Sequence, residues 1–326
     1  MSLALSTIAT ALLLFLPAVA APQSQQVAPL QPPPLAASAA PIPTLRIDAR
    51  LVSVALNVTD EHGAPVPHLA AGDFDLTEDN RPQRIAFFDS EQTTPLDIVL
   101  SVDSSESIFP DDHLERDAAR SFVTSVLRPQ DRIDLITFSD NVDELVPFTN
   151  DPRLVDRGLD RIHPGDATAL YDAITLASQR LAETPSANAS RRVLVLLTDG
   201  ENTTRHGTYA SALEAAERAG AMIYALILVP VQADAGRNTG GEHALIQLAA
   251  DTGGKSYDVA QPDDLAPALQ HVSADLRTQY ALGYYAPPHS AASSPLRHIH
   301  MQLKDPALRA RYTLRYRTAY FASPQP

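Results

Sequence analysis

Five oxygen-bearing side chains, grouped in three short segments of this sequence, could together bind a metal ion. The segment DSSES begins at residue 103, directly after the apolar run LDIVLSV. A threonine lies in HPGDATALYDAI, and a carboxylate in TDGEN follows the apolar run RRVLVLL. The chain has no cysteine, so these donors are all hard oxygens, which suit Mg²⁺, with Mn²⁺ or Ca²⁺ as alternatives. The five predicted metal ligands are Asp103, Ser105, Ser107, Thr168 and Asp199.

The spacing of Ser105 and Ser107 matters because adjacent residues in an extended segment point in opposite directions. Positions two apart can therefore present both hydroxyls to one ion. A hydroxyl is a neutral and weak donor, so a cation held largely by hydroxyls stays electrophilic. An acidic group from another molecule could then complete its coordination shell, which indicates a binding site rather than a closed structural metal site.

The elements that must position these ligands form an α/β pattern over residues 94–279. Helical patterns such as HLERDAARSFVTSVL alternate with runs that have the composition of strands buried on both faces. The runs that are apolar almost throughout are 96–102, 191–198 and 221–230. We therefore predict a doubly wound, Rossmann-like, mostly parallel sheet. The carboxyl ends of its central strands would bring Asp103 and Asp199 to one edge, with the Thr168 loop beside them.

Alternating β patterns flank this region on both sides. Before it, at 45–93, apolar and polar residues alternate in VSVALNVT, and DFDLTEDNRPQRIAFFD indicates two strands around a turn at Asp79-Asn80. After it, at 280–322, HIHMQL and YTLRY alternate in the same way. Neither set of strands is stable alone. We therefore predict one small β-sandwich built from both ends of the chain, with the α/β domain inserted in it. Two separate β appendages are the alternative.

The N-terminal region predicts export. Residues 1–20 carry no charged side chain, contain the apolar run ALLLFLPAVA and end in a small-residue cleavage pattern, Ala-Val-Ala. This is typical of a Sec-type signal peptide, and an N-terminal membrane anchor is the alternative. Residues 21–44 are proline-rich and uncharged, which predicts a disordered linker. The mature protein would then be secreted, or held in the periplasm or cell envelope, without a stable membrane span.

The composition and motifs disfavour several classes of function. The formal net charge of −14 repels phosphate backbones, so we expect no nucleic-acid partner. The sequence has no P-loop, no Gly-x-Gly-x-x-Gly after a strand, no Gly-x-Ser-x-Gly and no His-Glu-x-x-His. A phosphatase that used Asp103 as nucleophile would need an acid two positions on, where Ser105 stands. We therefore expect that the protein is not an enzyme.

These segments resemble the von Willebrand factor type A domain, whose metal-ion-dependent adhesion site has the pattern Asp-x-Ser-x-Ser, then Thr, then Asp. The resemblance covers roughly residues 94–279. The flanks VPHLAAGDFDLTEDNRPQRIAFF and LRTQYALGYY are similar to a bacterial subgroup of secreted proteins with this domain. The resemblance implies that the two serines bind the metal directly, the threonine directly or through water, and the aspartates mostly through water. Glu106 is a departure, because the family usually has glycine there.

The ligand set and the resemblance lead to one predicted function. It is divalent-cation-dependent protein–protein binding or adhesion, in which an acidic side chain of the partner completes the metal shell. Two alternatives stay open: a metal-dependent, phosphatase-like hydrolase, and a structural envelope protein with a stabilising metal. The sequence leaves the partner's identity, the choice of metal and the oligomeric state open.

Overall fold

The structure, a computed structural model, describes residues 50–89, 94–105, 112–184, 190–228, 238–287 and 294–322. The chain divides into two compact units, Met1–Ile47 and Asp48–Pro326, and every described residue belongs to the second. The predicted signal peptide and linker lie outside the described residues and stay predictions, and Ser107 also lies outside them. Within the described part of the chain, none of the helices has the length and apolar character needed to cross a membrane.

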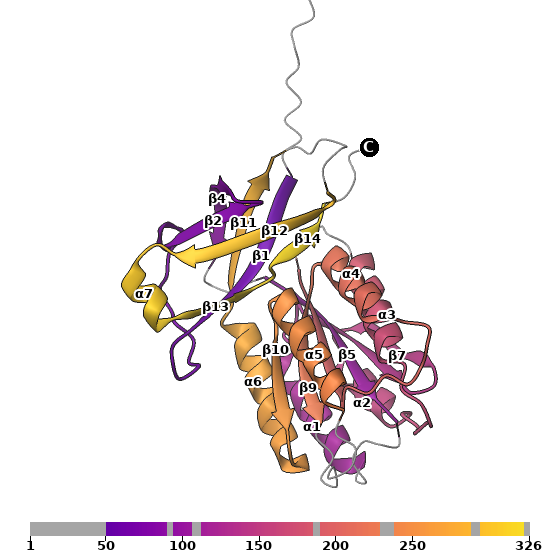
Figure 1. Cartoon of the computed structure of the whole chain (residues 1–326). Coiled ribbons are helices and arrows are strands. Elements are labelled where there is room, and N and C mark those ends of the chain that lie inside the picture. The colour runs from indigo at the N-terminus through magenta and orange to yellow at the C-terminus, as the bar shows by residue number, and fades with distance from the viewer. Residues whose placement is uncertain are drawn as a thin grey trace, which may run out of the picture. The chain divides into compact units, whose positions relative to one another are not determined.

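A six-stranded sheet forms the centre of the α/β part (Figure 1). Its strands lie in the order β10-β9-β8-β5-β6-β7, and all neighbours pair in parallel except β6 and β7. The predicted mostly parallel sheet is confirmed. The strands are β5 (Leu96–Asp103), β6 (Arg132–Phe138), β7 (Val142–Thr149), β8 (Arg191–Thr198), β9 (Ala221–Leu228) and β10 (Lys255–Val259).

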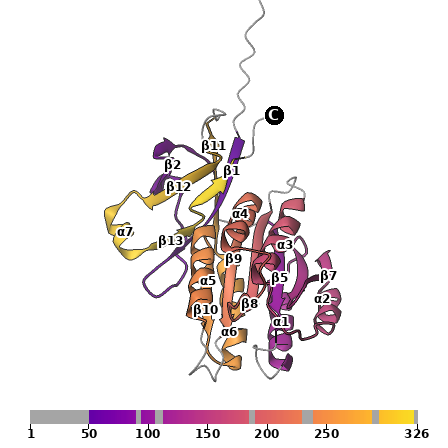
Figure 2. The same ribbon diagram turned by 45° about the vertical axis from the view of Figure 1, so that its right-hand side comes forward.

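Helices cover both faces of this sheet because its central strands are apolar on both sides. In β5, Ile98 and Leu100 pack in one core and Val99 packs in the other. The first core includes side chains of α1, α2 and α6, and the second includes those of α3, α4 and α5 (Figure 2). The helices are α1 (Asp112–Val126), α2 (Pro152–Leu159), α3 (Leu170–Glu183), α4 (Tyr209–Ala219), α5 (Thr239–Thr252) and α6 (Leu265–Arg277).

The strands before and after the α/β part form the predicted β-sandwich (Figure 1). One sheet has the order β13-β1-β11-β4 and the other β14-β12-β2-β3, so each combines strands from both ends of the chain. The two sheets share one apolar core that includes Leu56, Leu76, Leu282 and Met301. The elements are β1 (Arg50–Thr59), β2 (Phe74–Glu78), β3 (Arg81–Gln83), β4 (Ile85–Asp89), β11 (Tyr280–Ala286), β12 (Leu296–Leu303), the short helix α7 (Pro306–Arg311), β13 (Thr313–Tyr316) and β14 (Ala319–Phe321).

Two segments that the sequence pattern presents as single strands change sheets. The turn at Asp79 and Asn80 is where we expect it, with φ angles of 46° and 64°, but the strand after it is split into β3 and β4 in different sheets. The last strand is split in the same way at Thr318, whose N–H donates to the carbonyl of Asp251 at the end of α5 (3.1 Å). An alternating pattern continues through such a crossing, so alternation alone does not reveal it.

A buried carboxyl pair lies on the α3 side of the sheet. Asp134 of β6 is 0 % exposed, and neither of its oxygens has an N–H donor among the described residues. Its neighbour is the carboxyl of Glu144 on β7, which pairs with Arg180 of α3. Burial raises the pKa of Asp134 to about 8, the hydrogen bond and charge of Glu144 act in the same direction, and the charge of Arg180 opposes them. Asp134 is therefore largely protonated in the folded protein at neutral pH.

We predict that Asp134→Asn stabilises the protein at pH 8. Between about pH 4 and pH 8 the folded state binds more protons at this site than the unfolded state, so the free energy of unfolding falls as the pH rises. Asparagine removes this loss and keeps the size of the side chain, and the gain at pH 8 should be roughly 1–3 kcal/mol. Urea unfolding at pH 5 and pH 8 measures it.

The control for this experiment is Asp143→Asn, which changes an exposed carboxylate on β7. It should leave the pH dependence of the unfolding free energy as it is in the parent protein. If Asp134→Asn and Asp143→Asn show the same pH dependence, the buried carboxyl is not the titrating group.

Candidate metal centre

Strand pairing places Asp103 beside the end of β8. Asp103 is the last residue of β5, and β5 pairs in parallel with β8 along its length. The hydroxyl of Thr198 donates to Oδ2 of Asp103 (2.6 Å), and the backbone N–H of Ser105 donates to Oδ1 (3.0 Å). Both carboxylate oxygens are thus fixed by hydrogen bonds. Asp199 follows Thr198 directly, so the two aspartates lie at the carboxyl ends of neighbouring parallel strands.

The loop before α3 brings Thr168 to the same edge of the sheet. The N–H of Gly165 donates to the carbonyl of Ser104 (3.0 Å), just after β5. The N–H of Ala169 donates to the carbonyl of Ser139 (2.8 Å), just after β6. Because these bonds reach the ends of two strands, the loop lies across the carboxyl edge of the sheet.

A second contact connects Thr168 to the segment that follows Asp199. The N–H of Thr203 donates to the carbonyl of Thr168 (3.0 Å), and the N–H of Thr168 donates to the hydroxyl of Thr203 (2.8 Å). Asp199 is itself held in a turn, where its Oδ1 accepts the N–H of Glu201 (3.0 Å). Thr168 and Asp199 therefore lie in two segments that are hydrogen-bonded to each other.

The structure brings four of the five predicted ligands to one edge of the sheet, and all four are buried. Their exposed fractions are 2 % for Asp103, 8 % for Ser105, 2 % for Thr168 and 8 % for Asp199. Ser107 and its neighbour Glu106 lie outside the described residues. Across the described ranges, no group of three or more His, Cys, Asp or Glu residues is placed to hold a metal. The predicted site has only two carboxylates, and hydroxyls supply its other donors.

The two aspartates have no basic partner in the part of the chain that the structure describes. No Lys, Arg or His of the described residues lies within ion-pair distance of Asp103 or Asp199. Burial raises the pKa of Asp103 to about 7; hydrogen bonds from Thr198 and Ser105 lower it, and the charge of Asp199 raises it. Ionising a carboxyl group that is buried here lowers the stability of the fold, and a bound divalent cation would offset that cost. The oxygen donors therefore fit Mg²⁺, Mn²⁺ or Ca²⁺.

Sequence reasoning missed the residues that hold these ligands in place. Thr198 fixes the Asp103 carboxylate, and Thr203 fixes the backbone of Thr168. The available signal for Thr198 is a hydroxyl that closes an otherwise apolar strand, RRVLVLLT. Thr203 has no such signal, because its role depends on a loop that is distant in the sequence.

The backbone after Asp199 packs against the first turn of α5. Gly200 has a φ of +83°, a conformation that favours glycine. A Cβ on Gly241 would lie 1.9 Å from the carbonyl oxygen of Gly200. Asn238 caps α5 by accepting the N–H of Gly241 (3.0 Å), and its side-chain amide donates to the carbonyl of Gly200 (3.4 Å). The position of Asp199 thus depends on a glycine that is distant in the sequence.

We predict that Gly241→Ala displaces this turn, lowers the free energy of unfolding by about 1–3 kcal/mol and weakens Mg²⁺ binding, because the added methyl group has no room. Gly240→Ala is the matched control, since its Cβ would come no closer than 3.6 Å to Asn238. Its effect should stay within about 0.5 kcal/mol. Urea unfolding and calorimetric Mg²⁺ titration compare the two variants. Equal stability and equal affinity would show that the close packing at Gly200 has no role.

A comparison with family models agrees with the resemblance noted in the sequence. Residues 98–201 match the family model of the von Willebrand factor type A domain. This range contains β5 from its third residue, α1, β6, β7, α2, α3 and β8, and it includes all five predicted metal ligands. No curated protein sequence matches the chain.

Solved structures resemble the chain at low identity. An aerotolerance-related membrane protein from Bacteroides fragilis NCTC 9343, with multiple mutations to serines, is 19 % identical with a TM-score of 0.43, over 56 % of this chain and 98 % of that one. Proximal thread matrix protein 1 from the mussel byssus, with a zinc-occupied MIDAS motif (metal-ion-dependent adhesion site), is 19 % identical with a TM-score of 0.47, over 63 % of this chain and 50 % of that one. A von Willebrand factor type A protein from Catenulispora acidiphila is 12 % identical with a TM-score of 0.48, over 86 % and 76 %. Because these TM-scores are below 0.5, the solved structures do not establish the fold. The observed strand order and the family match support it instead.

Proposed function

We propose that this chain, which carries a von Willebrand factor type A domain at residues 98–201, binds a protein ligand through a divalent cation. An acidic side chain of the partner completes the shell of the cation. The observation that carries the proposal is the buried pair Asp103 and Asp199, which no basic side chain of the described residues balances. The proposed metal ligands are Asp103, Ser105, Ser107, Thr168 and Asp199.

Mg²⁺ is the proposed metal, with Mn²⁺ or Ca²⁺ as the alternatives. Carboxylate and hydroxyl oxygens are the kind of ligand that these ions prefer. The donors from Ser105, Ser107 and Thr168 are neutral, so the ion keeps enough positive character to attract a carboxylate of the partner. This distribution of charge supports an exchangeable ligand position over a closed metal site.

We propose that the site binds and does not catalyse. Both oxygens of Asp103 accept hydrogen bonds, from Thr198 and from Ser105, which disfavours a nucleophilic role for that carboxylate. In the described part of the chain no histidine or lysine forms an ion pair with Asp103 or Asp199. A nucleophile paired with a base, the usual arrangement for hydrolysis, therefore has no support among these contacts.

The proposed place of action is outside the cytoplasm. The predicted signal peptide at residues 1–20 supports export to the periplasm, the cell envelope or the medium, and the proline-rich segment 21–44 supports a spacer role. The net charge of −14 supports a protein partner over a nucleic acid.

We predict that Asp103→Asn weakens Mg²⁺ binding by about tenfold or more and preserves the fold. The amide oxygen can still accept the N–H of Ser105, but one of the two charges that attract the cation is lost. Calorimetric Mg²⁺ titration measures the affinity, and circular dichroism checks the fold. Asp166→Asn is the matched control, because Asp166 is an exposed carboxylate in the same loop as Thr168. Unchanged Mg²⁺ affinity in Asp103→Asn would overturn the proposed site.

Partner binding needs its own experiment. Immobilised parent protein with Mg²⁺ should retain a protein from an envelope extract, a chelator should elute it, and Asp103→Asn should not retain it. Retention that survives both the chelator and the substitution contradicts the proposal. Mg²⁺ binding that stabilises the protein without such a partner favours the structural alternative. Mg²⁺-dependent turnover of a phosphoester that Asp103→Asn loses favours the hydrolase alternative.

A further inference from the structure

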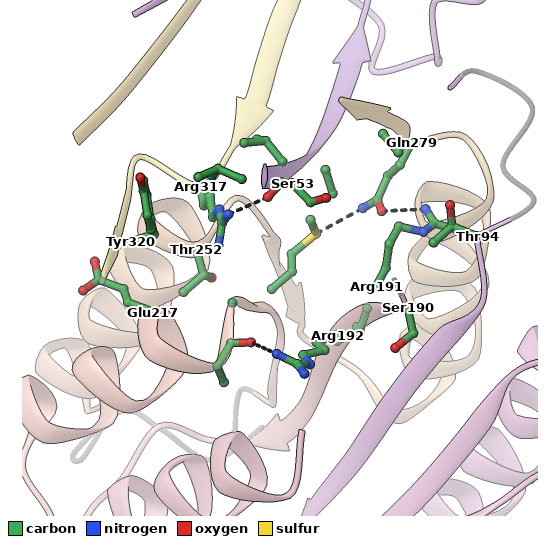
Figure 3. Close-up of a pocket in the computed structure, with 18 of the residues that line it drawn as sticks. Ser53, Thr94, Ser190, Arg191, Arg192, Glu217, Thr252, Gln279, Arg317 and Tyr320 are labelled. Atoms are coloured by element: carbon green, nitrogen blue, oxygen red, sulfur yellow. Dashed lines mark hydrogen bonds between the residues drawn. The ribbon is translucent and has the colours of Figure 1, made fainter. Parts of the chain in front are cut away.

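A cavity of about 510 Å³ lies at the amino end of β8, the opposite end of that strand from Asp199 (Figure 3). Residues of β1, the start of β8, the end of α4 and the region around β14 line it. Cavities that bind small molecules have volumes of about 300–1,000 Å³. The cavity is large enough for a ligand and shares no residue with the proposed metal centre.

Three arginines that line the cavity form no ion pair within the described part of the chain: Arg191, Arg192 and Arg317. None of them lies within ion-pair distance of an Asp or Glu among the described residues, whereas Arg218 at the same cavity pairs with Glu214 (2.7 Å). Of the described residues that line the cavity, Glu217 is the one acid. The cavity lining therefore has an excess of positive charge.

Arg191, at the start of β8, is 9 % exposed. Its Nη1 donates to the carbonyl of Leu276 (2.9 Å) and to Oε1 of Gln279 (2.8 Å), the second of which Figure 3 shows. Its Nε and Nη2 have no hydrogen-bond partner in the described part of the chain. Burial lowers the pKa of Arg191 to about 10, and the charge of Arg277 adds to this effect. The guanidinium is therefore charged at neutral pH, and its protein partners are neutral oxygens.

Arg317 and Arg192 are in a similar situation. Arg317 donates to the carbonyl of Ser53 on β1 and lies over the ring of Tyr320 (5.3 Å), and its Nε has no partner among the described residues. Arg192 donates to uncharged oxygens at the ends of α3 and α4. Burial lowers the pKa of both guanidinium groups. A carbonyl satisfies an N–H group but does not balance its charge. The carboxylates that act on the three guanidinium groups, Asp131, Asp97 and Glu217, lie beyond ion-pair distance, so the positive charges are only partly balanced.

Part of the cavity lining is apolar. Leu51 of β1 and Phe87 of β4 are 49 % and 48 % exposed, and both line the cavity. Gly283 of β11 pairs with Phe87, and a Cβ on it would lie 3.1 Å from Leu51, so the glycine leaves room for that side chain. Phe321 of β14 also lines the cavity. Exposed apolar side chains and arginines whose charge is only partly balanced thus line one open cavity, which suits a ligand with an anionic and an apolar part.

We propose that this cavity binds a small organic phosphate, that is, a phosphate group on an apolar body. Guanidinium groups of the cavity lining bind the phosphate, Arg317 among them, and Leu51, Phe87 and Phe321 contact the apolar body. A phosphate monoester carries about −1.5 to −2 charges at pH 7, which suits a lining with more guanidinium than carboxyl groups better than a single carboxylate does. Guanidinium groups bind phosphate oxygens in pairs of hydrogen bonds. Binding also offsets the cost of burying positive charge without a counterion.

Titration calorimetry of the full chain with hexyl phosphate tests the proposal. Arg317→Gln and Phe87→Ala should each weaken binding by about fivefold or more, and both side chains are partly exposed, so the variants should fold. The matched controls lie on α2, away from the cavity. Arg157→Gln removes the same charge, and Leu154→Ala shortens an apolar side chain that is 39 % exposed. Both controls should bind hexyl phosphate as the parent protein does.

The choice of ligand is tested with related compounds. Inorganic phosphate, hexanoate and hexanol should each bind more weakly than hexyl phosphate, because none combines a dianionic phosphate with an apolar chain. Equal binding of inorganic phosphate and hexyl phosphate would overturn the apolar part of the proposal, and equal binding of hexanol would overturn the role of the arginines. Dihexanoyl phosphatidate separates a lipid headgroup from a soluble phosphate. If it binds more tightly than hexyl phosphate, a lipid replaces the small ligand that we propose.

The site of binding is tested separately from the metal centre. Hexyl phosphate binding should persist in a chelator and in Asp103→Asn, since Asp103 lies at the other end of the sheet. Loss of binding in either case would place the anion at the metal centre and overturn the proposal. Equal affinities in Arg317→Gln and Arg157→Gln would also overturn it. Neither result bears on whether the metal centre binds a protein partner.

Discussion

The hydrogen bond from Thr198 to Asp103 (2.6 Å) is the contact on which the candidate metal centre depends. It forms because β5 and β8 pair in parallel and end at the same edge. The N–H of Ser105 then reaches the same carboxylate, and the loop with Thr168 binds the ends of β5 and β6. Burial makes the charged form of Asp103 unfavourable, so this arrangement costs stability. The two apolar cores on either side of the sheet hold the strands in place against that cost.

The β-sandwich contacts the α/β part at the opposite ends of the parallel strands. Arg315 of β13 donates to Asp275 of α6 (2.6 Å) and to the carbonyl of Gly254 just before β10 (3.0 Å). Thr318 binds the carbonyl of Asp251 at the end of α5. Since β1 pairs with β11 and β2 with β12, the strands on both sides of the inserted part are joined to each other. The sandwich thus contacts the α/β part at the amino ends of the parallel strands, whereas the metal centre lies at their carboxyl ends.

The candidate metal centre and the cavity lie at the two ends of β8, and the physical reason is the same for both. The interior of β8 is buried on its two faces, so its side chains there must be apolar. In β8 the polar side chains occur only where the strand begins or ends. Arg191 and Arg192 occupy the beginning, and Asp199 follows the end. The carboxyl end of β8 therefore carries a hydroxyl and a carboxylate, and its amino end carries two guanidinium groups.

Local patterns in the sequence determined the order of the elements and the identity of the candidate ligands. Apolar runs and helical periodicity predict the parallel sheet, and Asp103, Ser105, Ser107, Thr168 and Asp199 stand out from their neighbours without any knowledge of the fold. Only the tertiary structure decided which distant residues support them, such as Thr203 for Thr168 and Gly241 for Gly200. It also decided that Arg317, in a segment that reads as an ordinary alternating strand, lines a cavity. The physical reason is that periodicity and propensity act between residues close in the sequence, whereas contacts at strand ends depend on which segments the folded chain brings together.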